Sequence, residues 1–164
     1  RRSRSNGMGG HDGAEYAPIG RPPDATVVAP LSSALYPYEE VFMQRTFTKR
    51  IASSVESELE NAKLARSAGD FSQEFTHLER AHVLGQESTY WHVKVHVLML
   101  VWATRNGLVR EALGQVFRIV GAATKTAFGL VPQGNTGGAN VSPFKKMPVS
   151  PELAALIQRA KSGV

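Results

Sequence analysis

Residues 71–102 constrain the fold of this chain more than any other stretch, because their sequence marks where helices begin and end. Asp70 is a good N-cap for the helix that follows it, and Gly85 suits the end of that helix about four turns later. Ser88 or Thr89 then caps another helix. The stretch therefore predicts a helix, a tight turn and a second helix that runs back antiparallel to the first.

Apolar periodicity and turn residues place the other helices. Pro37 disfavours a helical conformation at Tyr36, so the first helix is expected to begin just after it. We expect helices over about residues 38–68, 70–85, 89–105, 108–128 and 151–161. No stretch is a clear strand. The predicted fold class is all-α, a bundle of about four or five antiparallel helices and helical hairpins. Residues 1–37 form an extended tail, residues 38–164 form a single helical domain, and a long Gly/Asn/Pro loop at 129–150 precedes the last helix.

The spacing of apolar residues predicts which helix faces are buried. In the first helix an apolar stripe recurs every turn, at Phe47, Ile51, Val55, Leu59 and Ala62. In the fourth helix the residues expected to point inward are Leu113, Val116, Phe117, Val120 and Ala123. Gly114 and Gly121 lie inside this helix at a cost to its stability, which indicates close packing against a neighbour.

Composition excludes several classes of function. The chain has no cysteine, which rules out disulfides, thiolate metal sites and a cysteine nucleophile. The net charge of +5 is scattered along the chain without interleaved aromatic residues, so no nucleic-acid partner is expected. No stretch reaches the roughly 20 apolar residues of a spanning helix. We therefore expect no transmembrane helix in this chain, although its partners could lie at a membrane.

Residues 1–30 are rich in Gly, Pro, Ser and Arg and lack apolar periodicity, so they cannot bury enough surface to fold alone. We expect this segment to bind partner subunits, with Arg1, Arg2 and Arg4 among the contacts, or to be disordered. Its Arg/Ser-rich start without an initiator methionine fits what remains after cleavage of an organellar presequence. A truncated chain is the alternative.

Four of the five histidines lie in the predicted hairpin. His92 and His96 are four residues apart, so they point the same way from one helix, within reach of one metal ion. Glu74 and His77 form an E-x-x-H pair on the preceding helix, as in bundles that bind metals between helices. The candidate ligands are Glu74, His77, His92 and His96. His82 and Glu79 are expected to hold these ligands in place without binding the metal themselves. Imidazoles and carboxylates without a thiol suit zinc, iron or copper.

A purely structural role for these histidines is the alternative. A di-iron site needs about four carboxylates and two histidines. Only Glu39, Glu40, Glu56 or Glu60 is left to complete such a set. His77 and His82 are five residues apart and do not share a helix face. The histidine rings could equally be core residues that pack against Tyr90, Trp91 and Trp102 and hydrogen-bond a neighbour through their polar edges. No Ser/His/Asp constellation has a recognisable context, so the chain is not expected to be an enzyme.

The segment GNTGGAN at residues 134–140 resembles a phosphate-binding loop in composition only. It lacks the Walker lysine spacing, and no strand precedes it. Its glycines and asparagines favour a compact loop with left-handed residues. The loop is also a candidate docking surface, with Asn135 and Asn140 as its interaction residues.

Three motifs in order resemble a family of short bacterial proteins of unknown function, whose genes often lie among heavy-metal-resistance genes. They are HLERAHVLGQ at 77–86, the H-x-x-x-H of His92 and His96, and GNTGGANVSPFKKMPVSPEL at 134–153. The resemblance covers roughly residues 40–157 and does not include the N-terminal tail. Residues 69–84 are also similar to the second half of a tetratricopeptide repeat, although no second copy follows at the repeat period.

Two functions remain as expectations. The first is a non-catalytic accessory subunit of a larger assembly, with a mitochondrial respiratory-chain or ATP synthase-type complex as the expected setting. The second is a metal-binding or metal-handling protein that uses the histidine hairpin, as the bacterial resemblance implies. The first places the chain in a mitochondrion, and the second fits a bacterial cytoplasm.

Overall fold

The computed structural model of the chain describes residues 36–125 and 131–163. The expected partner-binding tail, with Arg1, Arg2 and Arg4, lies outside the described residues except for its last two positions. These positions, Tyr36 and Pro37, already belong to the first helix, which therefore begins slightly earlier than predicted. A proline is tolerated there because the N–H groups of the first helical turn have no intrahelical acceptor.

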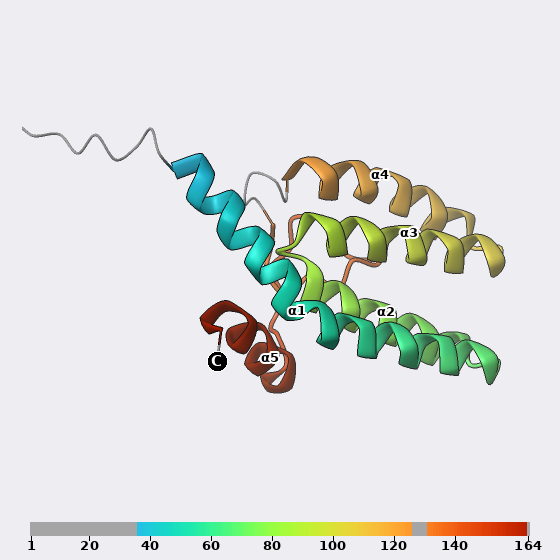
Figure 1. Ribbon diagram of the computed structural model, residues 1–164. Helices are drawn as coiled ribbons and strands as arrows, with labels where there is room; N and C mark the ends of the chain where they lie inside the picture. The colour runs from blue at the N-terminus through green and yellow to red at the C-terminus, as the bar shows by residue number, and fades with distance from the viewer. Residues whose placement is uncertain (1–35, 126–130, 164) are drawn as a thin grey trace, which may run out of the picture. The chain divides into compact units, whose positions relative to one another are not determined.

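The described part of the chain contains five α-helices and no strand, so the all-α prediction is confirmed (Figure 1). The helices are α1 (Tyr36–Ser67), α2 (Phe71–Gly85), α3 (Thr89–Arg105), α4 (Val109–Lys125) and α5 (Pro151–Ser162). The last three residues predicted for the fourth helix, 126–128, lie outside the described residues. Among the helices that are described, none has the length and hydropathy that crossing a bilayer requires.

The helices pack mainly against their neighbours in the sequence. α1 lies along α2, α2 contacts α3, and α3 lies along α4, while α5 packs against α1 and α2 (Figure 1). The predicted apolar stripe of α1 is buried as expected. The core cluster joins Phe47, Ile51, Val55, Leu59 and Ala62 of α1 to Leu78, Ala81 and Leu84 of α2, Trp91, Val95 and Met99 of α3, and Leu153 and Ile157 of α5.

The turn between α2 and α3 is short because both of its ends are tightly specified. The Ser88 hydroxyl accepts a hydrogen bond from the Trp91 N–H and so caps α3. Gly85 ends α2 at a point where an added Cβ would lie 2.7 Å from the Trp91 Cβ. Only glycine allows the end of α2 to approach the first turn of α3 this closely. This close approach brings His82, which precedes the turn, face to face with His92 and His96, which follow it.

The apolar face of α4 was predicted to point inward, and that prediction is wrong. Leu113, Val116, Phe117 and Val120 are 59%, 49%, 79% and 63% exposed, and Ala123 is exposed as well. Among the described helices α4 packs only against α3. Its buried residues are Gln115 and Ala122. The helix therefore turns polar and small residues toward the rest of the molecule and leaves its apolar stripe in solvent.

The two glycines of α4 differ in their surroundings. A Cβ on Gly114 would lie 2.5 Å from the Ala139 Cβ, so the close packing expected at this position is confirmed. A Cβ on Gly121 would meet nothing within 4 Å. The neighbour at Gly114 is the irregular segment 131–150, which takes the place that another helix would occupy.

Segment 131–150 is held against α4 and α2 by polar contacts. The Glu111 carboxylate accepts a hydrogen bond from the Ala139 N–H at 2.9 Å. The Arg118 guanidinium donates to the carbonyls of Gly138 (2.8 Å) and Val141. At the end of the segment Ser150 caps α5. These contacts order an otherwise irregular segment beside the histidines of α2 and α3.

Candidate metal centre

Three buried histidines meet where α2 and α3 face each other. His82 comes from α2, while His92 and His96 lie one turn apart on α3. Their exposed fractions are 2%, 7% and 2%. One ring nitrogen of each lies within 4.8 Å of the others. Within the described residues this is the one group of three or more potential ligands from His, Asp and Glu whose ligand atoms come so close.

The hydrogen bond on the far side of His82 fixes its tautomer. Its Nδ1 lies 2.8 Å from the backbone carbonyl oxygen of Asn135. A carbonyl oxygen only accepts, so Nδ1 carries the proton and donates it. In the neutral ring the Nε2 atom then has no proton and presents its lone pair to the site.

His96 has the same tautomer, fixed by a longer chain of contacts. Its Nδ1 lies 2.7 Å from Oε1 of Gln115. The Gln115 amide cannot be flipped, because its Nε2 lies 2.7 Å from the Glu111 carboxylate and 2.9 Å from the Gly137 carbonyl, and both of these only accept. Oε1 therefore faces His96 and accepts from Nδ1–H. The Nε2 of His96 is left with a lone pair.

These two assignments bring two unprotonated nitrogens together. Nε2 of His82 and Nε2 of His96 are 3.1 Å apart. Two lone pairs facing each other at this distance repel unless a cation lies between them. Two imidazole nitrogens on one tetrahedral metal ion, with metal–nitrogen distances of about 2.0–2.1 Å, are roughly 3.3 Å apart. The observed separation is close to that of a shared metal ion.

A proton between the two rings is disfavoured by their surroundings. Burial lowers the pKa of His82 well below its usual value, and the neighbouring charges of protonated His96 and His92 would lower it further. Burial also lowers the pKa of His96 to about 4. The pKa of His92 falls to about 3, again mainly because of burial. All three rings are therefore neutral near pH 7, which is the state that binds metals.

His92 completes a triangle of rings. Its ring centroid lies 4.7 Å from that of His82 and 4.9 Å from that of His96. The i, i+4 spacing of His92 and His96 places both rings on the α3 face that meets α2. Three imidazoles converge on one point, from two helices held together by the tight turn between them.

Segment 131–150 encloses the site from the side of α4. Asn135 is 2% exposed, and its side-chain amide donates to the carbonyls of Ser142 and Lys145 while its Oδ1 accepts from the Gly137 N–H. Gly137 has φ +85°, and a Cβ there would lie 2.9 Å from the His82 ring. Asn135 and Gly137 thus lie directly against His82. Asn135, a candidate docking residue from its sequence, is buried and bonded within the chain, while Asn140 is exposed.

The histidines open onto a cavity of about 390 Å³ between α4 and segment 131–143. Apart from the three rings, its lining consists of Arg118, a few polar loop residues and an apolar wall. That wall includes Phe117, Ala122, Val131, Pro132, Val141 and Pro143. The candidate metal position therefore has one open side.

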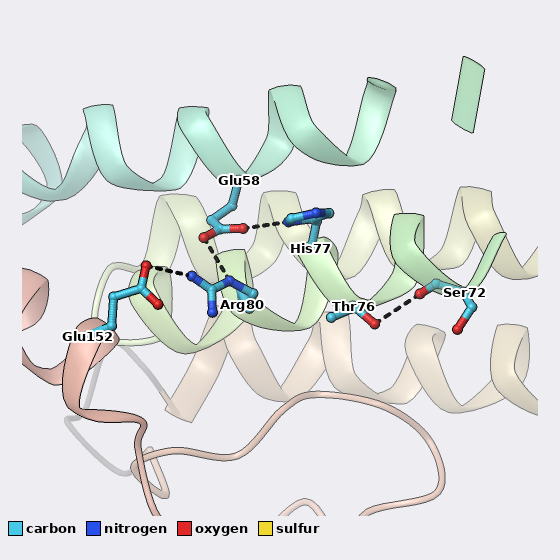
Figure 2. Close-up of polar contacts among 6 residues, drawn as sticks. All are labelled: Glu58, Ser72, Thr76, His77, Arg80 and Glu152. Atoms are coloured by element: carbon cyan, nitrogen blue, oxygen red, sulfur yellow. Dashed lines mark hydrogen bonds and ion pairs between the residues drawn. The ribbon is translucent and has the colours of Figure 1, made fainter. Parts of the chain in front are cut away.

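The structure does not bring the four predicted ligands together. His92 and His96 meet as expected, but Glu74 forms an ion pair with Arg105 on the side of α2 that faces the end of α3. His77 Nδ1 lies 2.7 Å from the Glu58 carboxylate of α1. Figure 2 shows His77 and Arg80 of α2 both pointing toward Glu58. Because His77 and His82 lie on different faces of α2, only His82 can join the pair on α3.

Glu79, the other predicted supporting residue, lies beside the loop. Its side chain hydrogen-bonds Thr136, and burial raises its pKa, to which the negative charge of Glu111 adds. Gln115 and Glu111 were not predicted to support the site. Their signal in the sequence is weak, since the i, i+4 spacing of a glutamate and a glutamine on a helix is common.

One family comparison bears on this site. A family described as a protein of unknown function (DUF3703) matches residues 49–157, which is more than half of the chain and includes all three histidines. No curated protein and no solved structure matches the chain significantly.

Proposed function

This chain belongs to the DUF3703 family, whose description carries no activity, and we propose that it binds a transition-metal ion through His82, His92 and His96. The observation that carries the proposal is the 3.1 Å approach of two Nε2 atoms whose tautomers leave both of them unprotonated. A metal ion at this point converts a repulsion between lone pairs into two coordinate bonds.

The surroundings of the rings support this proposal. Histidines that bind metals usually donate their second N–H to a carbonyl or carboxylate, which fixes the tautomer and aims the ligand nitrogen. His82 donates to Asn135 O and His96 donates to Gln115 Oε1. The resemblance to a family found among heavy-metal-resistance genes points in the same direction.

The ligand set favours zinc or copper over iron. Imidazole nitrogens suit all three metals, but the common non-haem iron site adds a carboxylate to two histidines. The Glu74 carboxylate is paired with Arg105. The Glu58 carboxylate is bonded to His77 and Arg80. A three-histidine site with one open position is a familiar zinc geometry.

Calorimetric titration of the metal-free protein with Zn²⁺ tests the proposal. One ion is expected to bind per chain. His96→Ala is expected to weaken binding about 100-fold or more, because loss of an outer-shell partner alone typically costs about 10–100-fold. His77→Ala is the matched control, because His77 lies on α2 but contacts Glu58 instead of the site. Absence of Zn²⁺ and Cu²⁺ binding by the unaltered protein, or equal losses in the two variants, would refute the proposed site.

The role of an interaction subunit is a second candidate, and the exposed face of α4 favours it. Val109, Leu113, Val116 and Val120 follow the 4-3-4 spacing with which one helix packs against another, and Phe117 lies beside them. The occupant that this spacing suits best is a second copy of the same helix. Sedimentation at increasing concentration would show a dimer, which Phe117→Ser should weaken. A monomer at all concentrations would count against self-association.

A further inference from the structure

The cavity beside the three histidines has an unusual balance of charge. The described residues that line it include the histidines and Arg118 but no Asp or Glu. The Arg118 charge is close enough to disfavour protonation of all three rings. A divalent metal ion held by neutral imidazoles would therefore add its charge beside a guanidinium. A buried charge without a counter-charge is costly.

The nearest carboxylates do not supply the missing charge. Glu111 partly offsets the charge of Arg118, but its oxygens already accept from Gln115 and Ala139, and it does not line the cavity. Glu79 has a raised pKa because of burial, which disfavours its charged form. Among the described residues, no acidic side chain lines the cavity, so an anion bound in the cavity would supply the counter-charge.

We infer that the cavity binds a small organic anion, a carboxylate or thiolate with an apolar body, whose charged end occupies the open metal position beside Arg118. This inference rests on the proposed metal site. The open position faces the cavity, and most of the other residues that line the cavity are apolar. About 390 Å³ is far more space than a hydroxide or halide needs and falls in the range of small-molecule pockets.

Arg118 is held in a suitable orientation by the loop. Its Nη2 donates to the carbonyls of Gly138 and Val141. These bonds reduce the freedom of a long side chain, so less conformational entropy is lost when an anion binds. A charge-assisted hydrogen bond to the anion is worth about 1.5–3 kcal/mol, which corresponds to roughly tenfold or more in affinity.

Benzoate binding to the Co²⁺-loaded protein tests the inference, since the visible spectrum of Co²⁺ reports on its ligands. Benzoate should change the spectrum saturably and bind more tightly than acetate, whereas benzamide, which has a similar shape and no charge, should leave it unchanged. Equal affinities of benzoate and acetate would overturn the role of the apolar walls. An equal response to benzamide would overturn the role of charge.

The Arg118→Met variant sharpens the test. It should bind Co²⁺ at least as tightly as the unaltered protein, because a repelling positive charge is removed, and it should lose about tenfold or more in benzoate affinity. Arg110→Met is the matched control, because Arg110 is an exposed residue of the same helix that does not line the cavity. Unchanged benzoate affinity in Arg118→Met would overturn the inference. If that variant does not fold, the benzoate and benzamide comparison on the unaltered protein still decides.

The two proposals fail in different ways. If Co²⁺ does not bind, the metal site fails before any anion is added. If Co²⁺ binds and benzoate does not alter its spectrum, the metal site stands and only the anion site fails.

Discussion

His77 and His82 lie five residues apart on α2, and their environments are opposite. His77 is on the face toward α1, where it shares the Glu58 carboxylate with Arg80, and Arg80 also reaches Glu152 of α5 (Figure 2). His82 is on the face toward α3, where its partners are a backbone carbonyl and another imidazole. The face toward α1 carries a network of ion pairs, and the face toward α3 carries neutral imidazoles that have unprotonated nitrogens.

This difference separates a structural histidine from a candidate ligand. At His77 both oxygens of the Glu58 carboxylate are already engaged, one by the His77 ring and the other by the Arg80 guanidinium. At His82 the polar partners fix a tautomer and leave a lone pair aimed at a second lone pair. Only in the second environment would a metal ion relieve an unfavourable contact, which is why we propose the metal site there.

The largest expected difference between the two regions is in pH dependence. The folded-state pKa values of His82, His92 and His96 are lowered, so the folded protein binds fewer protons than the unfolded chain. Their contribution to stability is fully present above the unfolded pKa of about 6.5 and is lost as pH falls toward the folded values of about 4 and about 3. Several kcal/mol are involved, because one pKa unit corresponds to about 1.4 kcal/mol.

Urea unfolding of the metal-free protein at about pH 7.5 and about pH 5.5, above the range in which most carboxylates titrate, measures this effect. The loss of stability should persist in His77→Ala and shrink in His92→Gln. A stability that stays constant between the two pH values would contradict the neutral, buried state of the three rings.

Gly137→Ala should disturb the His82 region strongly. The added Cβ would lie 2.9 Å from the His82 ring, at a backbone φ of +85° that alanine rarely adopts. A loss of about 2–3 kcal/mol in unfolding free energy is expected. Gly107→Ala is the control, since its φ is +69° but nothing lies within 4 Å, so only the backbone cost of about 1 kcal/mol remains. Equal losses in the two variants would show that the contact with His82 is unimportant.

Gln115→Leu removes the acceptor of the His96 Nδ1–H without touching a ligand nitrogen. Loss of such a supporting partner typically costs about 10–100-fold in metal affinity. Glu58→Gln, in the ion-pair network, should leave Zn²⁺ affinity unchanged. Calorimetry on both variants compares the two regions directly. A larger loss of Zn²⁺ affinity in Glu58→Gln would reverse the assignment of roles.

Glu152→Ala should have the smallest effect. The Glu152 side chain is 67% exposed, and within the described residues it forms one ion pair, with Arg80, which keeps its bond to Glu58. Removal of such an exposed pair is expected to cost between about 0 and 1 kcal/mol. Thermal unfolding with and without Zn²⁺ should give nearly the same values as the unaltered protein. A large loss would mean that α5 depends on this contact.

The sequence predicted the helices well because their signals are local. Asp70 and Ser88 cap α2 and α3 through bonds to residues three positions away. The apolar stripe of α1 follows from helical periodicity alone. The pairing of His92 and His96 follows from one turn of helix. Each of these inferences needs only the geometry of a single helix.

The face of α4 could not be predicted in this way. Its periodicity is real, but periodicity identifies an apolar face without showing whether any neighbour covers it. In the described structure the opposite face of α4 is buried, because Gln115 and Glu111 bond to segment 131–150 and to His96. The neighbour of α4 on this buried face is segment 131–150, which is irregular and has no apolar periodicity from which its position could be predicted.

The candidate site, like the fold, was predictable from the sequence only in part. The sequence predicts the helix hairpin and two of its histidines, because caps, glycines and i, i+4 spacing act over a few positions. Which histidine of α2 joins them depends on how α2 is rotated against α1 and α3, and that rotation is set by packing over the whole core. The tautomers that make the site a metal candidate depend on Asn135 and Gln115, partners brought close only by folding.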